Sequence, residues 1–364
     1  MDAATGTVVF SKNPDDEIPP ASLTKLMTMH LALREIEAGR ASLYETIVPE
    51  RESWAVNQEP GSSLMYLANG QQLNLRDLLL GMAVFSGNDA ATAAALRFGS
   101  TKKGFVEMMN REAESLGLVK THFVDAAGYW EDNITTAGEF AEFCRLYLEA
   151  HPYALREYHS VREFAYPRAE NVGEQYRGNP GTRVRLNTNT LLGKVEGVDG
   201  LKTGYIPEAG YNLALTAERG GSRFIAVILG APSGWGGDRL RDEDGRKLIE
   251  WVYENYKTIR LAPDMPEPVR VWKGRENSAE FVWGAPLVFT SRAERGENPN
   301  WVIEIEEPVI APVAAGSGAG TMVLYDSLGE LYRIPLLYAR DIERGGFFKR
   351  QLDSIRLFFR RLFA

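Results

Sequence analysis

A proline-rich segment at residues 261–268, with the sequence LAPDMPEP, divides the chain into two parts that follow different patterns. Proline lacks an amide N–H and has a fixed φ, so this segment is unsuited to a helix interior or a central strand. Amphipathic helical patterns dominate the part before the segment, and short alternating runs typical of strands dominate the part after it. A chain of 364 residues is long enough for two domains, so we expect a domain boundary near residue 260.

The first part combines helices with strands. A short strand is expected over residues 3–11, and two strands joined by Gly220 and Gly221 are expected over residues 210–232. Helical patterns cover residues 21–39, 74–98 with a break at 86–88, 100–118, 136–151 and 238–257. This combination predicts an α/β (α+β) sandwich domain over residues 1–260.

The second part predicts a small all-β domain over residues 261–340, because its short alternating runs are separated by Gly, Pro and Asn. The glycine-rich segment AAGSGAG at 314–320 is followed by no helical pattern, so we interpret it as a turn within the sheet and not as a nucleotide-binding loop. No apolar run reaches the roughly 18 residues that a membrane-spanning helix needs.

The last twenty residues, GGFFKRQLDSIRLFFRRLFA, form a strongly basic segment. Five basic side chains against Asp353 leave a net charge of +4, whereas the whole chain carries −8 and the remainder therefore −12. One helical face would carry Phe348, Leu352, Ile355, Phe359 and Leu362. The pattern predicts an amphipathic helix within 341–364 that anchors the protein to an anionic membrane surface. Packing on its own domain and binding a partner remain alternatives, and the acidic remainder makes nucleic acid a poor partner.

The stretch PPASLTKLMT, residues 19–28, places Ser22 and Lys25 three residues apart at the start of a helical pattern. Side chains at this spacing share one helical face. A serine needs an adjacent base to become a nucleophile, and a lysine can be that base if burial lowers its pKa. The free N–H groups at a helix start can also stabilise an oxyanion. Taken alone, however, so short a pattern favours a capped helix with a solvated lysine.

Two further motifs favour the catalytic interpretation: Ser86-Gly87-Asn88, and then Lys202-Thr203-Gly204. The order S-x-x-K, S-x-N, K-T-G is that of β-lactamases and penicillin-binding proteins. On these motifs and on the phrases around them, among them GMAVFSGNDAA, VDGLKTGYIPEAGYNLALTA and VIAPVAAGSGAGTMVLYD, the chain resembles the low-molecular-mass penicillin-binding proteins. These are serine-type D-alanyl-D-alanine carboxypeptidases of the peptidase S11 family, and the resemblance covers nearly the whole chain.

The resemblance implies catalytic roles for four side chains. Ser22 would be the acylated nucleophile, and Lys25 would be the base that takes its proton. Ser86 would relay a proton to the leaving D-alanine, and Asn88 would bond Lys25 and the amide of the substrate.

The resemblance also implies a substrate-binding set made of Lys202, Thr203, Gly204 and Tyr205. Lys202 would supply positive charge and Thr203 would bond the substrate carboxylate. The backbone N–H groups of Ser22 and Tyr205 would form the oxyanion hole.

Two positions depart from the pattern of the family. Tyr205 stands where many members have histidine, which leaves the backbone donor in place. Thr188 stands where some members have an arginine near the carboxylate site, and Arg183 or Arg185 is a candidate replacement.

The implied activity is removal of the terminal D-alanine from peptidoglycan stem peptides through an acyl-enzyme, with β-lactams as covalent inhibitors. It requires no cofactor and no metal, and the sequence contains no H-E-x-x-H motif. The implied location is the cell envelope, in the periplasm or on the outer face of the cytoplasmic membrane, with a peripheral anchor. A serine β-lactamase on the same fold and a non-catalytic peptidoglycan-binding homologue are the alternatives.

Overall fold

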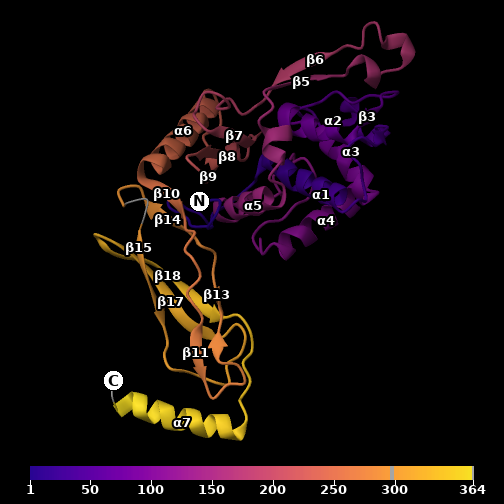
Figure 1. Cartoon of the computed structure of the whole chain (residues 1–364). Helices are drawn as coiled ribbons and strands as arrows, with labels where there is room; N and C mark the ends of the chain where they lie inside the picture. The colour runs from indigo at the N-terminus through magenta and orange to yellow at the C-terminus, as the bar shows by residue number, and fades with distance from the viewer. Residues whose placement is uncertain (296–298, 363–364) are drawn as a thin grey trace. The chain divides into compact units, whose positions relative to one another are not determined.

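The computed structural model describes residues 1–295 and 299–362 and comprises two compact units, Met1–Glu254 and Asn255–Ala364. Figure 1 labels their main elements. The helices are α1 (Lys25–Glu37), α2 (Leu75–Leu80), α3 (Asn88–Gly99), α4 (Lys102–Ser115), α5 (Ala137–Ala150), α6 (Gly237–Asn255) and α7 (Phe347–Leu362).

The main sheet of the first unit is the antiparallel array β7-β8-β9. The strands of this unit are β1 (Glu17–Ile18), β2 (Thr46–Ile47), β3 (Leu73–Asn74), β4 (Thr135–Thr136), β5 (Glu163–Tyr166), β6 (Arg183–Leu186), β7 (Val198–Ile206), β8 (Gly210–Arg219) and β9 (Ser222–Ala231). Gly220 and Gly221 join β8 to β9 with φ values of +55° and +76°, the left-handed conformation that favours glycine. The expected hairpin is confirmed.

Strand β8 is buried on both faces because helices cover the sheet on each side. Its Leu213 and Leu215 pack with Ile249 of α6, while Ala214 joins the large core that α1 to α5 supply. Successive side chains of a strand point to opposite faces, so Leu213 and Leu215 lie in one layer and Ala214 in the other. The first unit is therefore the expected α/β sandwich (Figure 1).

Two details of the first unit bear on the sequence-based expectations. The expected break in the 74–98 pattern is present at Ser86 and Gly87, which belong to no helix and separate α3 from the π-helical turn, Gly81–Phe85, that follows α2. The expected strand over 3–11 is wrong: residues 3–5 form a turn and residues 6–11 belong to no strand. The turn brings the N–H of Asp2 to the carbonyl oxygen of Thr7, and Gly6 adopts a φ of +71° there.

The second unit is an all-β domain followed by α7, as the sequence predicts. Its strands are β10 (Tyr256–Arg260), β11 (Val269–Trp272), β12 (Ser278–Ala279), β13 (Phe281–Trp283), β14 (Val288–Arg292), β15 (Asn300–Ile305), β16 (Val309–Ile310), β17 (Gly318–Asp326) and β18 (Gly329–Tyr338). The largest sheet has the order β13-β18-β17-β15, and the segment at 314–320 leads into β17 without a helix.

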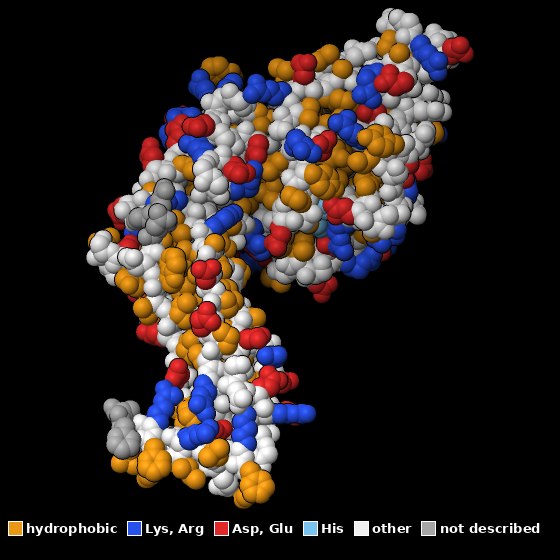
Figure 2. Space-filling view, viewed as in Figure 1, with side chains coloured by type: hydrophobic (Ala, Val, Ile, Leu, Met, Phe, Trp, Pro, Cys, Tyr) orange, Lys and Arg blue, Asp and Glu red, His pale blue; other side chains and the backbone are white. Residues whose placement is uncertain are grey.

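Helix α7 packs on this β domain through a narrow strip. Asp353 and Leu357 are buried, and the Asp353 carboxylate accepts a hydrogen bond of 2.8 Å from the N–H of Lys273. Arg360 donates to Glu307 at 2.8 Å. Large apolar side chains cover the lower side of the helix in Figure 2 and are exposed: Phe347, Phe348, Leu352, Ile355, Phe358, Phe359 and Leu362. Within the described residues, no helix has the length and apolar content needed to cross a membrane.

Candidate active site

Ser22 lies in a 3-10 turn, Ala21–Thr24, that precedes α1. In a 3-10 helix, residues three apart lie one directly above the other, so Lys25 falls in line with Ser22 more closely than in an α-helix. Ala21 has a φ of +50°, a left-handed conformation that is unfavourable by roughly 1–2 kcal/mol for a residue with a Cβ. Such strain is typical of functional sites, where the surrounding structure holds it in place.

Lys25 is fully buried and its Nζ has three oxygen partners. The distances are 2.9 Å to Ser22 Oγ, 2.7 Å to Asn88 Oδ1 and 2.7 Å to the carbonyl oxygen of Ala127. The last two atoms can only accept hydrogen bonds. A neutral amine would give them its two hydrogens and would direct its lone pair at the Ser22 hydroxyl, which is the geometry of a general base.

The charge state of Lys25 follows from its surroundings. Burial lowers the pKa of Lys25 from 10.5 to about 7, while the carboxylates of Asp125 and Asp89 oppose the shift. A large fraction of the amine is therefore neutral near neutral pH. The low pKa required of the base is thus produced mainly by desolvation.

Ser86 and Asn88 come from the turn between α2 and α3. Ser86 is buried and ends the π-helical turn with a φ of +57°, and Asn88 begins α3. Asn88 accepts from Lys25 through its oxygen and donates to Ser62 Oγ at 3.0 Å through its nitrogen. The buried carboxylate of Asp89 accepts from the N–H groups of Met65 and Leu67 and holds the loop that carries Ser62.

Strand β7 supplies the third motif. Lys202 is buried and its Nζ donates to the carbonyl oxygen of Thr203 at 2.8 Å, while the Thr203 hydroxyl donates to Thr188 Oγ1 at 2.7 Å. A Cβ at Gly204 would lie 2.8 Å from the carbonyl oxygen of Pro20 and 3.1 Å from the nitrogen of Ser22. Glycine therefore lets β7 approach the Ser22 turn closely.

Lys202 lies in a positive environment. Burial lowers its pKa well below the ordinary value, and the charges of Lys25 and Arg241 add to this effect. Arg241 comes from α6, is 5% exposed, and lies over the Tyr211 ring at 5.8 Å. An anion placed here would meet several cationic groups.

Tyr205 follows Gly204 on β7 and points outward. It is 43% exposed and stacks on Tyr211 with ring centroids 4.3 Å apart. Arg183 and Arg185, the candidate replacements for the missing arginine, contact Tyr66 instead. Arg183 lies 4.1 Å over the Tyr66 ring, and Arg185 is 3.5 Å from its hydroxyl.

The sequence motifs missed three contributors to this site. Ala127 contributes its backbone carbonyl oxygen, which accepts from Lys25, and the residue type gives no sign of such a contact. Arg241 stands in RDEDGRK, a run typical of an exposed helix face. Asp125 accepts hydrogen bonds from the N–H groups of Ala127 and Gly128. In the sequence, only an acid followed by small residues, a pattern typical of an Asx-turn, indicates this role.

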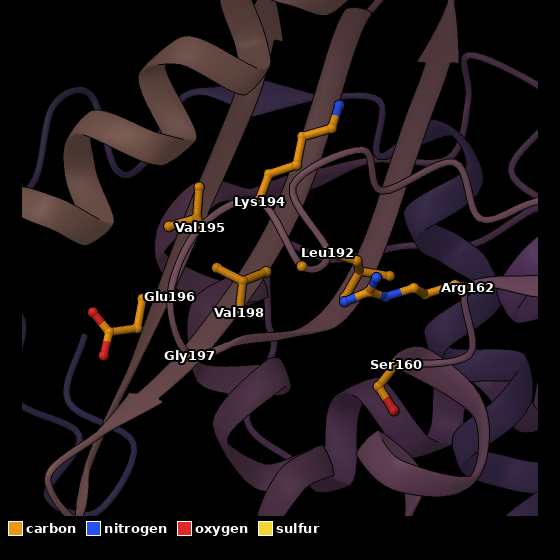
Figure 3. A pocket seen from close by; sticks show the side chains of 9 residues that line it. Ser160, Arg162, Leu192, Lys194, Val195, Glu196, Gly197 and Val198 are labelled. Carbon is orange, nitrogen blue, oxygen red and sulfur yellow. The ribbon is translucent and has the colours of Figure 1, made fainter.

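A separate hollow of about 280 Å³ lies at the other end of β7 (Figure 3). The loop from Leu192 to Val198 forms most of its wall, with Ser160 and Arg162 opposite, and none of the three motifs lines it. This hollow is not the catalytic cleft.

Comparisons with known proteins agree with this geometry. The sequence profile of the Peptidase_S11 family, D-alanyl-D-alanine carboxypeptidase, matches residues 1–233, and that of the C-terminal domain of penicillin-binding protein 5 matches residues 255–344. The chain is 31% identical to D-alanyl-D-alanine carboxypeptidase DacC of Escherichia coli, over all of this chain and 88% of that protein. It is 32% identical to DacD of the same organism, over 97% of this chain and 88% of that protein.

Solved structures show the same likeness. Penicillin-binding protein 5 from Haemophilus influenzae superposes with a TM-score of 0.80 at 26% identity, covering 94% of this chain and 96% of that one. Penicillin-binding protein D2 from Listeria monocytogenes, in its ampicillin-bound form, superposes with a TM-score of 0.57 at 30% identity, covering 68% of this chain and 93% of that one.

Proposed function

The chain belongs to the peptidase S11 family of D-alanyl-D-alanine carboxypeptidases, and on this basis we propose the roles of its individual residues. It removes the terminal D-alanine from peptidoglycan stem peptides through an ester on Ser22. The observation that carries the proposal is the contact of Lys25 Nζ with Ser22 Oγ at 2.9 Å, while two carbonyl oxygens occupy the other positions around the amine.

Acylation begins when neutral Lys25 takes the hydroxyl proton of Ser22 and Ser22 Oγ attacks the carbonyl carbon of the penultimate D-alanine. The backbone N–H groups of Ser22 and Tyr205 stabilise the oxyanion. The C–N bond then breaks, and a proton returned through Lys25 and Ser86 lets the terminal D-alanine leave as an amine. Water cleaves the ester in the second half of the cycle and restores the Ser22 hydroxyl, with Asn88 orienting Lys25 and the substrate amide.

The carboxylate of the substrate binds at Lys202, Thr203 and Gly204. Burial lowers the pKa of Lys202 well below its ordinary value, so its ammonium is disfavoured in the free site. A bound carboxylate offsets this penalty and favours the charged form. Thr203 turns its hydroxyl from Thr188 to the carboxylate, and Arg241 adds positive field. Substrate binding is therefore expected to raise the pKa of Lys202.

A single experiment tests the activity against its two alternatives. The protein is incubated with labelled penicillin and, separately, with a peptide ending in D-Ala-D-Ala. A long-lived penicillin adduct together with release of D-alanine supports the carboxypeptidase. Rapid penicillin turnover without peptide cleavage would identify a β-lactamase, and peptide binding without either reaction would identify a non-catalytic homologue. The variant Ser22→Ala should form no adduct, and an adduct on that variant would exclude Ser22 as the nucleophile.

The parts of the chain have separate tasks in this proposal. Residues 1–260 form the catalytic domain, residues 261–340 form the β domain, and residues 341–364 anchor the enzyme to an anionic membrane surface on the outer side of the cytoplasmic membrane. Support for the anchor comes from α7, where Phe348 is 86% and Phe359 54% exposed beside basic side chains. Burial of such apolar area in the lipid interface, with attraction of lysine and arginine to anionic lipid, favours binding.

The anchor is tested by sedimentation of the full chain with vesicles of phosphatidylglycerol and with vesicles of phosphatidylcholine. Binding should be stronger to the anionic vesicles and should weaken with salt. Replacing Phe358 and Phe359 by serine should lower the affinity on the order of 10²-fold or more, because each phenylalanine contributes about 2 kcal/mol on burial. Val56→Ser, at an exposed valine of the first unit, is the control and should leave binding unchanged. If the double serine variant bound the anionic vesicles as tightly as the unmodified protein, α7 would be excluded as the anchor.

A further inference from the structure

Asp125 lies at the head of a tight loop that contacts the start of α1. Its Oδ1 accepts the N–H groups of Ala127 and Gly128, both at 2.6 Å. Its Oδ2 accepts from Tyr129 and Trp130, each at 3.1 Å. One carboxylate thus gathers four successive backbone N–H groups, which is far more than an ordinary surface acid receives.

The other side of the same loop faces α1. The carbonyl oxygen of Ala127 accepts from Lys25 Nζ at 2.7 Å, and the carbonyl oxygen of Ala126 accepts from Thr28 Oγ1 at 2.7 Å. At Gly128, where φ is +75°, a Cβ would lie 1.8 Å from the carbonyl oxygen of Ala21. The backbone of the loop therefore packs directly on the turn that carries the nucleophile.

One peptide group connects the two charged side chains. The C=O of Ala127 and the N–H of Gly128 belong to the same amide, and in a trans peptide they point in opposite directions. The oxygen of this amide accepts from Lys25, and its N–H donates to Asp125. Hydrogen bonds at both ends of one amide polarise each other, so the carboxylate strengthens the oxygen as an acceptor for the amine.

We propose that Asp125 is the positioning residue of the base: it holds the Ala127–Gly128 amide toward Lys25, and through that amide its negative charge acts against release of the Lys25 proton. The inference rests on the proposed function, in which Lys25 is the base. Asp125 touches no substrate and acts only through the loop and its field.

Other charged groups near Lys25 also affect its pKa. Burial lowers the pKa of Lys25 to about 7, and of the two carboxylates that oppose the shift, Asp125 acts more strongly than Asp89 of α3. The facing cation is Lys202 of β7, whose own pKa is lowered in part by Lys25. Asp89 is deeply buried whereas Asp125 is half-buried, so Asp125 is the carboxylate chosen for neutralisation, although it also accepts from Asn133 Nδ2 at 2.7 Å.

The test is the pH dependence of penicillin acylation in the full chain, measured as the second-order rate constant between pH 5 and 9. In Asp125→Asn, the amide oxygen can still accept from Ala127 and Gly128 while the charge is lost. The acidic limb of the profile should move to lower pH by on the order of one unit, because the neutral amine persists at lower pH. The rate above the limb should fall by less than about tenfold.

Two further variants separate charge from shape. Asp132→Asn removes an exposed acid of the same loop and should leave the profile unchanged, since solvent screens its charge. Asp125→Ser keeps a short hydroxyl acceptor without charge and should show the same downward shift even if its rate is lower. Thermal unfolding of each variant shows whether the loop change has affected folding.

The outcomes are distinct. A downward shift in both Asp125 variants with none in Asp132→Asn supports the inference. Rates that fall equally at every pH, with the limb in place, would make Asp125 a purely structural residue and overturn it. If the unmodified protein forms no penicillin adduct at all, the proposed function fails instead, so the two failures cannot be confused.

Discussion

The first turn of α1 and the exposed face of α7 both reverse the usual distribution of side chains, in opposite directions. At α1 a lysine is completely buried, and at α7 Phe348 is 86% exposed. Lysine is almost never fully buried without partners, and contiguous exposed apolar surface is uncommon in soluble proteins. The lysine is accommodated by three oxygen partners within its own domain. The phenylalanines of α7 instead remain exposed on the surface of their own unit, which is consistent with the proposed lipid surface.

The two departures fit the different tasks that we propose for α1 and α7. Burial at α1 changes the chemistry of one group, because desolvation lowers the pKa of the amine. Exposure at α7 changes no chemistry, and in the proposed function it supplies apolar area for association with lipid. Variants in α1 should therefore alter rate and pH dependence, and variants in α7 should alter attachment and local stability.

The largest expected effect is at Lys25. Lys25→Met should lower the rate of penicillin acylation by roughly 10³-fold or more, since the base is removed while the length of the side chain is kept. The midpoint of thermal unfolding should stay within a few degrees, because relief from burying an amine offsets the loss of three hydrogen bonds. Lys25→Arg is the matched control: it keeps donors but cannot give up a proton, so it should be equally slow. Near-normal acylation of either variant would contradict the assignment of the base.

A second buried group should show that desolvation in the first unit also affects stability. Burial lowers the pKa of His159 from 6.5 to about 3, and its Nε2 is 2.7 Å from the hydroxyl of Tyr147. The unfolded chain binds a proton below pH 6.5 and the folded chain does not, so stability is complete above 6.5 and declines toward pH 3. At pH 4.5 the loss is about 3 kcal/mol.

Urea unfolding at pH 7 and pH 4.5 measures this difference. His159→Gln has no group that titrates there, so its free energy of unfolding should change with pH by about 2–3 kcal/mol less than that of the unmodified protein. The same pH dependence in both proteins would mean that His159 is protonated in the folded state. The exposed arginines of α7 should make no such contribution.

The smallest effect is expected where α7 meets its β domain. Asp353 is 3% exposed and accepts from the N–H of Lys273, with Arg270 at 3.8 Å. Asp353→Ala should weaken this attachment by about 1–2 kcal/mol, visible as an earlier loss of helical circular dichroism on heating. Penicillin acylation should not change.

The control for this variant is Glu343→Ala, at an exposed acid that pairs with Arg275 at 3.4 Å. Surface pairs of this kind contribute little, so its melting curve should match that of the unmodified protein. If Asp353→Ala slowed acylation, the separation between the chemistry of α1 and the attachment of α7 would no longer hold.

Much of the fold and of the site could be predicted from local sequence patterns. Glycines at 220 and 221 mark the β8–β9 turn because only a left-handed backbone closes that hairpin tightly. The spacing of Ser22 and Lys25 places both on one side of a helical turn, and the structure brings Lys25 into contact with Ser22 and with Asn88. The expectation for residues 3–11 failed because apolar alternation does not supply a pairing partner.

The sequence by itself determined which chemical groups are present and their order along the chain, since these depend on residue type and spacing. Only the tertiary structure decided that Lys25 is buried, that Lys25 and the carboxylate of Asp125 lie on either side of the Ala127–Gly128 amide, and that Arg241 rather than Arg183 or Arg185 acts on Lys202. The reason is physical: a pKa depends on solvent exclusion and on charges brought together by folding, and neither is a property of a local run of residues.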